Sequence, residues 1–241
     1  MRSLVRCITA LCSPALLAVA GCADTIGSSP DAPTPAKPAV TSPAASAPSA
    51  SDKEASLPEA VDRLAVRPES RTGYEREKFH HWVDADRDGC DTRKEVLISE
   101  ATKKPRQGGN CELTGGEWQS YYDGKTITDD SKLDIDHMVP LAEAWDSGAS
   151  KWNVEKREQY ANDLTVPRSL VAVTLSTNRS KGDQDVAEWL PPTSSVHCLY
   201  ATDWVSTKLR WKLTVDTAEH ATLVKVARRC PDAVATARPA P

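Results

Sequence analysis

Hydrophobic residues recur at helical spacing in several segments of the chain, with polar residues filling the intervening positions. Such spacing puts the apolar side chains on one face and predicts amphipathic helices that pack against a common core. The more polar segment VEKREQY also predicts a helix. The predicted helices span residues 57–66, 74–82, 92–101, 154–160, 200–213 and 217–229.

Two further segments predict the strands of a mixed α+β fold. LDIDHMV, residues 133–139, alternates apolar and polar positions and is ended by Pro140, which favours a short strand. LVAVTLS, residues 170–176, is a continuous apolar run that fits either a buried strand or a buried helix. TNRSKGDQDVAEWL follows and predicts a loop that leads into the start of a helix. The glycine-rich residues 105–132 predict loops with short strands around EWQSYY and KTIT.

Both ends of the chain differ from this central part. Residues 1–21 combine Arg2 and Arg6 with a short apolar run and end in VAG before Cys22, a pattern typical of a lipoprotein signal peptide. Cleavage there would leave Cys22 lipidated at the outer face of the membrane, whereas an ordinary signal peptide would be cut near Ala20 and release the protein.

The domain boundaries follow from composition. Residues 22–57 are rich in Pro, Ala and Ser and predict a disordered linker, because they cannot bury enough apolar surface to offset ordering entropy. Residues 58–232 then form one domain, and residues 233–241 a disordered tail. The net charge of −4 becomes more negative when the signal is removed, so a basic surface that coats DNA is not expected.

Four cysteines lie within the predicted domain, and an even number in an exported domain predicts two disulfides. Three pairings are open. We favour Cys90–Cys111 and Cys198–Cys230, because each pair flanks one local unit. A zinc site is the alternative, but no two of these cysteines have C-x₂-C spacing.

Candidate chemistry is concentrated in residues 133–183. Asp136 is a hard oxygen ligand suited to Mg²⁺ or Mn²⁺, and His137 can accept a proton at neutral pH. Hydrolysis of a phosphodiester needs both in one place, a cation on the phosphate and a base on the attacking water. Asn178 offers an amide oxygen to the same cation, and Lys181 lies one turn further on, where it can meet phosphate.

Other residues are assigned with less specific chemistry. Asn162 is expected in a loop, where it would brace the backbone and orient His137. Arg179 and Arg93 are candidates to bind phosphate. Asp134 is either an acid behind the metal ligands or a surface residue of its strand.

An acidic segment precedes this region. DADRDGCDTRKE matches the calcium-loop pattern D-x-[DN]-x-[DN]-G-x₅-E, and its candidate ligands are Asp84, Asp86, Asp88 and Glu95. Asp91 stands where such loops carry an aliphatic residue, and the chain has no second loop to pair with it. Two alternatives remain: Arg93 or Glu95 faces a catalytic cleft, or the acids form a solvated turn.

DIDHMVP, a middle Asn and NRSKGD together resemble the HNH nuclease family. They are similar to the HNH domain of RNA-guided CRISPR nucleases. They are closer still to exported bacterial proteins related to the C-terminal HNH domain of GmrSD-type restriction endonucleases. The resemblance also includes DRDGCDTRKEVL, REQYANDL, EWLPP and the last cysteines, and covers roughly residues 75–230.

The resemblance implies an HNH (ββα-metal) core embedded in a mostly helical, disulfide-braced domain. It implies that His137 is the general base, that Asp136 and Asn178 bind one divalent cation, and that Asn162 braces the site. The sequence departs from compact HNH motifs in the long gap between His137 and Asn162, in Asn178 standing where others have His, and in lacking zinc-binding cysteine pairs.

The expected function is therefore a metal-dependent endonuclease of low sequence specificity, exported and lipid-anchored or secreted. DNA is favoured as substrate, with RNA open, and no obligate protein partner is expected. The alternative is a non-catalytic calcium-binding surface module on an HNH scaffold. A metallopeptidase or cell-wall hydrolase is disfavoured, because no H-E-x-x-H or other clustered zinc ligands are present.

Overall fold

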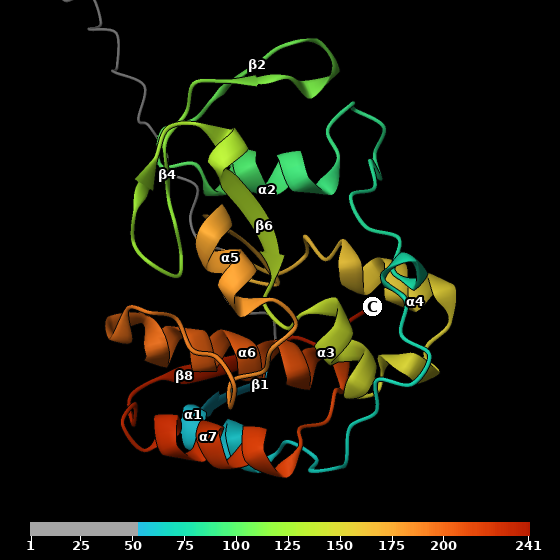
Figure 1. Cartoon of the computed structure of the whole chain (residues 1–241), viewed down its shortest axis with the longest axis vertical. Coiled ribbons are helices and arrows are strands. Elements are labelled where there is room, and N and C mark those ends of the chain that lie inside the picture. Colours follow the sequence, from blue (N-terminus) through green and yellow to red (C-terminus); the bar gives the residue numbers. More distant parts are fainter. Residues whose placement is uncertain (1–52) are drawn as a thin grey trace, which may run out of the picture. The chain divides into compact units, whose positions relative to one another are not determined.

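The structure is a computed structural model that describes residues 53–241. The expected signal peptide, Cys22 and most of the expected linker lie outside the described residues. Within the described part, the fold mixes helices with short strand pairs (Figure 1). The helices are α1 Leu57–Asp62, α2 Thr92–Glu100, α3 Leu141–Asp146, α4 Val154–Ala161, α5 Leu175–Lys181, α6 His197–Trp211 and α7 Thr217–Ala227. The expected α+β class is confirmed at this level.

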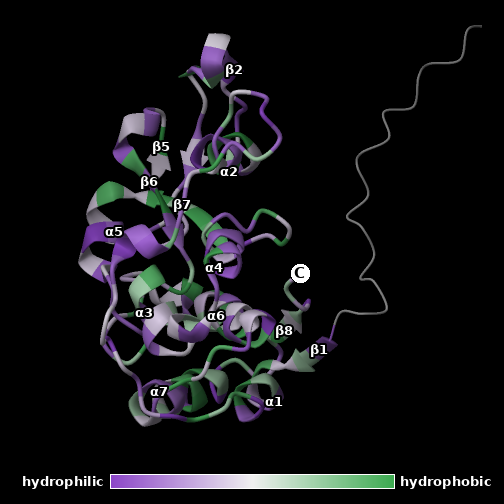
Figure 2. Ribbon diagram, turned by 90° about the vertical axis from the view of Figure 1, so that its right-hand side faces the viewer, coloured by the Kyte–Doolittle hydropathy of each residue, from purple (hydrophilic) through white to green (hydrophobic). Residues whose placement is uncertain are grey.

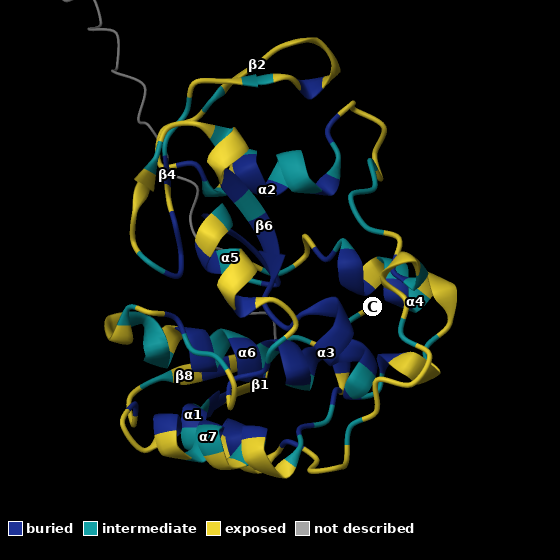
Figure 3. Ribbon diagram, viewed as in Figure 1, coloured by how far each residue is buried: buried dark blue, intermediate teal, exposed yellow. Residues whose placement is uncertain are grey.

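Strands β6 Leu133–His137 and β7 Leu170–Thr174 form the antiparallel pair at the centre of this fold, with Leu133 opposite Thr174 and His137 opposite Leu170. All five residues of β7 are buried, which explains why its sequence does not alternate (Figure 2). The paired strand β6 is mostly buried as well (Figure 3). Helix α5 begins directly after β7. The run LVAVTLS is therefore a strand that passes into a helix at Leu175.

Two apolar clusters surround this pair. The smaller cluster packs α2 and β4 (Trp118–Gln119) against one side of β6 and β7, around Leu97 and Trp118. The larger cluster joins α1, α3, α4, α6 and α7 around Trp204 and Trp211.

Three further strands complete short pairs near α2: β2 Arg106–Gln107, β3 Leu113–Thr114 and β5 Thr126–Ile127. The short strands expected around EWQSYY and KTIT are confirmed as β4 and β5.

The two disulfides are Cys90–Cys111 and Cys198–Cys230, as favoured from the sequence. The first connects the acidic segment to the β2–β3 hairpin region, and the second links the start of α6 to the end of α7. Among residues 53–241, no helix is long and apolar enough to cross a membrane.

Two expected segments are wrong. Residues 74–82 contain only the short 3₁₀ helix η1 Arg76–Lys78, because the backbone becomes extended at Phe79 and left-handed at Trp82 (φ 63°). The segment TNRSKGD begins in helix α5 rather than in a loop. That helix ends at Gly182, whose φ of 55° suits glycine and stops the helix there.

The expected boundaries at both ends of the domain also need correction. Strand β1 Lys53–Ser56, in the expected linker, pairs antiparallel with β8 Val234–Ala237, in the expected disordered tail. Ala55 and Ala235 are buried by this pairing, and Arg210 on α6 donates to the carbonyls of Arg238 and Pro239. Backbone pairing does not require large apolar side chains, so the small residues of both segments gave no sign of it.

Candidate functional site

The end of β6 and the exposed side of α5 meet at a small cavity of about 180 Å³. Asp136 and His137 reach it from the strand, and Asn178 and Arg179 reach it from the helix. Arg76, from η1, lines the same cavity. The structure therefore brings together both residues of the DH pair and the asparagine that the sequence places 41 positions after His137.

His137 is held in one tautomer. Its Nε2 lies 2.9 Å from the backbone carbonyl oxygen of Ala161, and a carbonyl can only accept, so Nε2 carries the proton. Burial lowers the pKa of His137 to about 3, which keeps the ring neutral near pH 7. Trp82 stacks on the ring with the centroids 5.6 Å apart. Nδ1 is then the basic nitrogen, and it has no hydrogen-bond partner among residues 53–241.

Asp136 is fixed through one of its two oxygens. Oδ2 accepts from Nζ of Lys181 at 2.5 Å and from the hydroxyl of Tyr122 at 2.5 Å. Neither contact uses Oδ1, and the side chain keeps 10% of its surface exposed. Burial raises the pKa of Asp136 and lowers that of Lys181, and the ion pair opposes both shifts. The carboxylate is therefore oriented with one oxygen available to a ligand.

The expected phosphate contact of Lys181 is wrong. Its side chain is 0% exposed and points inward from α5. Besides Asp136, Nζ donates to the carbonyls of His137 (2.9 Å) and Met138 (3.1 Å). All three protons of the ammonium group are thereby used, so Lys181 positions the end of β6 and cannot reach a substrate.

Asn178 is oriented by Asp134. Its Nδ2 donates to Oδ2 of Asp134 at 3.1 Å, so the amide oxygen of Asn178 has no partner among the described residues. Of the two interpretations of Asp134, the structure favours the acid that stands behind the site. Asn178 and Asp136 thus each present one hard oxygen to the cavity, the donor type that Mg²⁺ and Mn²⁺ prefer.

Asn162 ends helix α4 and acts on the backbone rather than on the His137 ring. Its Oδ1 accepts from the backbone N–H of Val83 (3.0 Å) and from the hydroxyl of Thr92 (2.8 Å). Its Nδ2 donates to the carbonyls of His80 (2.7 Å) and Glu158 (2.8 Å). These bonds tie the segment before α2 to the end of α4, and the neighbouring residue, Ala161, makes the contact to His137. The expectation that Asn162 contacts His137 itself is corrected accordingly.

Of the two arginines expected to bind phosphate, only one faces the cavity. Arg179 lines the cavity. Arg93 does not: its Nη2 donates to the carbonyls of Asp130 and Leu133, and so it holds the start of β6. The sequence-based expectation for Arg93 is therefore wrong. Arg76 was missed, as was Tyr122, because only the tertiary fold brings these residues to the end of β6.

The acidic segment before α2 forms a compact turn. Ligand oxygens of Asp84, Asp86 and Asp88 lie within 4.8 Å of one another, and a Glu95 oxygen lies as close to those of Asp88. Gly89 adopts a φ of 97°, which favours glycine. Oδ1 of Asp84 is buried without a hydrogen-bond partner. Burial and the three aspartates raise the pKa of Glu95. The turn is geometrically able to hold a cation, and Cys90 is excluded as a ligand by its disulfide.

Comparison with known proteins adds to this geometry. Residues 91–226 match the family model described as "GmrSD restriction endonucleases, C-terminal domain". A protein from Arthroderma benhamiae, described as an "Uncharacterized secreted protein", is 42% identical over 168 residues, which cover 69% of this chain and 81% of the relative. No solved structure matches the chain. The relative is fungal, so it gives no support to the expected bacterial origin of the group. The family match includes the β6, β7 and α5 segment and most of the described helices, and the chain therefore belongs to the family of GmrSD restriction endonuclease C-terminal domains.

Proposed function

We propose that this protein is an exported, metal-dependent HNH endonuclease that hydrolyses phosphodiester bonds. The observation that carries the proposal is the cavity at the end of β6, where Asp136 and His137 from β6 meet Asn178 from α5. The elements β6, β7 and α5 that build this site are two paired strands followed by a helix, the order expected of a ββα-metal core. Membership in a family named for restriction endonucleases supports the same class of reaction.

His137 is the proposed general base. Its Nε2–H is fixed on the carbonyl of Ala161, so Nδ1 is free to take the proton of the attacking water. When Nδ1 accepts that proton, the imidazole becomes positive. The Ala161 carbonyl dipole then stabilises the ring while holding its orientation. The stacked Trp82 prevents the ring from rotating out of line.

Asp136 and Asn178 are the proposed ligands of one divalent cation, Mg²⁺ or Mn²⁺. Both present oxygens, and each is oriented from behind, Asp136 by Lys181 and Tyr122 and Asn178 by Asp134. The bound cation would neutralise phosphate charge and stabilise the leaving oxygen. Arg179 and Arg76 line the cavity and would hold the remaining phosphate oxygens.

The proposed substrate is DNA, with RNA as the competing outcome. The chain carries a net charge of −4, so a broad basic surface is not what attracts the substrate. The cation and the two arginines would instead attract the phosphate groups of the substrate. Because every nucleic-acid sequence carries these groups, this favours low sequence specificity. The disulfides and the secreted relative support export. Lipidation at Cys22 belongs to the proposal as well, and lies outside the described residues.

The test is cleavage of plasmid and of single-stranded DNA or RNA in Mg²⁺, Mn²⁺ or EDTA. His137→Ala is expected to lower the cleavage rate by about 10²–10⁴-fold, because the water loses its base. His220→Ala, on helix α7 and away from the cavity, is the matched control and is expected to cleave normally. Full activity of His137→Ala, or of the wild type in EDTA, would overturn the mechanism.

A second candidate function is a calcium-binding surface module without catalysis. It is favoured by the convergence of Asp84, Asp86 and Asp88 and by the buried, unpartnered Oδ1 of Asp84. Calcium is then expected to raise the melting temperature, and Glu95→Ala is expected to reduce that rise. A calcium-dependent rise combined with no cleavage under any metal would favour this module over the nuclease.

A further inference from the structure

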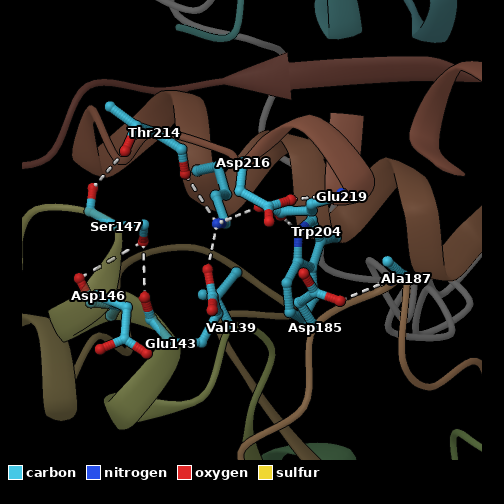
Figure 4. Close-up of polar contacts among 12 residues, drawn as sticks. Val139, Glu143, Asp146, Ser147, Asp185, Ala187, Trp204, Thr214, Asp216 and Glu219 are labelled. Atoms are coloured by element: carbon cyan, nitrogen blue, oxygen red, sulfur yellow. Dashed lines mark hydrogen bonds and ion pairs between the residues drawn. The ribbon is translucent and has the colours of Figure 1, made fainter. Parts of the chain in front are cut away.

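A second cavity, of about 260 Å³, lies between α3, α7 and the segment that follows α5, and it is lined mostly by acids. Figure 4 shows five acids of this region, Glu143, Asp146, Asp185, Asp216 and Glu219. Carboxylates reach it from four separate parts of the chain. Those that line it or point into it are Glu69, Glu143, Asp146, Asp183, Asp185, Glu188, Asp216 and Glu219. No sequence motif covers this set, and the proposed nuclease mechanism does not use it.

Lys208 is the buried cation beside this cavity, and its bonding capacity is full. Nζ donates to Glu143 Oε1 (2.5 Å), Glu219 Oε2 (2.8 Å) and the carbonyl of Thr214 (2.8 Å). Glu219 also accepts from the indole N–H of Trp204 at 2.5 Å. An ammonium group has three protons, so Lys208 has none left for the other carboxylates.

Arg71 covers only the outer edge. Its Nε donates to Oδ2 of Asp146 at 2.6 Å, and its Nη1 reaches Asp183 at 3.4 Å. The Asp146 side chain is only 7% exposed, and its other oxygen, Oδ1, is buried without a hydrogen-bond partner. Oε1 of Glu69 is buried without a partner too. Buried carboxylate oxygens cost free energy when left unpaired, so two such atoms at one cavity point to a missing positive partner.

The positions of the oxygens define where that partner would bind. One oxygen each from Glu69, Glu143 and Asp146 lie within 4.8 Å of one another, and so do oxygens of Glu69, Asp185 and Glu219. Two oxygens on opposite sides of a Ca²⁺ ion lie up to about 5 Å apart, because Ca²⁺–O distances are about 2.3–2.6 Å. Glu69 belongs to both groups and therefore lies at the centre of the set.

We propose that this cavity binds a Ca²⁺ ion through Glu69, Glu143 and Asp146, with Asp185 and Glu219 completing the oxygen set. Calcium suits the site better than Mg²⁺, because it accepts six to eight oxygens in irregular geometry. The ion would tie α3 and α7 to the segment after α5. Asp183 lines this cavity and the cavity of His137, so the ion would also steady one wall of the proposed active site.

The carboxyl groups of this cavity repel one another when no cation is bound. Burial, together with Glu143, raises the pKa of Glu69 to about 8, and burial raises the pKa of Asp146. A bound cation would favour the charged carboxylates instead. The competing arrangement is a cluster that shares protons and binds no metal, and the experiment separates the two.

The experiment measures Ca²⁺ binding to the full chain by calorimetry, in an Asp86→Asn/Asp88→Asn background that disables the acidic turn before α2. One Ca²⁺ ion is expected to bind in this background. Glu69→Gln is expected to weaken binding at least tenfold, and Glu155→Gln, an exposed acid on α4, is the matched control. Absence of Ca²⁺ binding in the background, or binding unchanged by Glu69→Gln, would overturn the proposal.

Melting temperatures give an independent readout that does not depend on nuclease activity. In EDTA at a pH above 8, where the carboxyl group of Glu69 is charged, Glu69→Gln is expected to melt above its parent, because it relieves repulsion among the carboxylates. In millimolar Ca²⁺ at the same pH the order is expected to reverse, because only the parent gains a bound ion. If Glu69→Gln stays the more stable form with and without Ca²⁺, the cluster binds no metal.

Discussion

Lys181 shows at the scale of single residues how a buried cation can position a candidate site without facing its cavity. The side chain is completely buried and contacts the carboxylate of Asp136 and two backbone carbonyls. In the sequence, the position of Lys181 three residues after Asn178 predicts a contact with phosphate. Burial excludes that contact, because a buried lysine must donate its protons to acceptors within the protein.

Lys181→Met is predicted to destabilise the protein by about 3–5 kcal/mol, because it leaves Asp136 buried without its partner. The double variant Asp136→Asn/Lys181→Met is predicted to recover much of this loss, since it removes the unpaired charge. Urea unfolding followed by tryptophan fluorescence measures both. Equal stability of Lys181→Met and the wild type would contradict the assigned role.

Asp203 provides a prediction about pH. Burial raises its pKa to about 6, while the hydrogen bond from the hydroxyl of Tyr121 works in the opposite direction. The unfolded chain has an aspartate pKa near 3.9, so the folded state holds this proton more tightly. The carboxyl therefore costs stability above pH 6, and this cost disappears as the pH falls towards 4.

Asp203→Asn is predicted to raise stability at pH 8 by on the order of 1–2 kcal/mol, because it removes the buried charge and keeps an acceptor for Tyr121. At pH 4 the variant and the wild type are predicted to be equally stable. Thermal unfolding at both pH values measures the difference, and a stabilisation that is the same at both would refute the shifted pKa.

At the scale of elements, Asn162 connects helix α4 to the segment before α2. Its four hydrogen bonds fix the end of α4, and the carbonyl of Ala161 on that end orients His137. The element, not the asparagine side chain alone, thus sets the tautomer of the proposed base. A residue remote from the cavity can therefore affect the orientation of the proposed base.

Asn162→Ala is predicted to lower the free energy of unfolding by about 2–4 kcal/mol, since four hydrogen bonds are lost, three of which are part-buried. The cleavage rate is predicted to fall as well, because the Ala161 carbonyl loses its support. Asn153→Ala is the matched control: Asn153 caps the other end of α4, so about 1 kcal/mol should be lost with the cleavage rate retained. An unchanged rate in Asn162→Ala would remove the positioning role.

At the scale of the whole described molecule, the two ends of the domain close on each other. Strand β1 precedes the first helix and pairs with β8 near the end of the chain, beside α6. The pair packs against α1 and α6, and Ala55 and Ala235 join the larger apolar cluster. The end of the chain is consequently part of the fold.

Deletion of residues 233–241 is predicted to lower the melting temperature by several degrees, because β1 loses its partner and Arg210 loses two acceptors. Removal of Pro241 alone is the control and should leave the melting temperature unchanged. Differential scanning calorimetry measures both truncations. A domain that melts normally without residues 233–241 would show that the β1–β8 pair adds nothing to stability.

The sequence by itself determined the periodic elements and the local chemistry. Helices α2, α4, α6 and α7, strand β6 and both disulfides could be predicted, because helical spacing, alternation and cysteine context are local signals. The identity of Asp136, His137 and Asn178 as a candidate site also followed from residue types and their order. Helix α5 was missed, because its polar residues lack the apolar stripe that marks a helix.

Only the tertiary structure decided which polar groups face a cavity and which are buried. In the fold, Lys181 points inward and Arg93 donates to the backbone at the start of β6. Arg76 lines the cavity of the candidate site, and the carbonyl of Ala161 is the hydrogen-bond partner of His137. It also gathered the carboxylates around Glu69 from segments up to 150 residues apart. The reason is physical: burial, hydrogen bonding and the pKa of a group depend on neighbours that are distant in sequence.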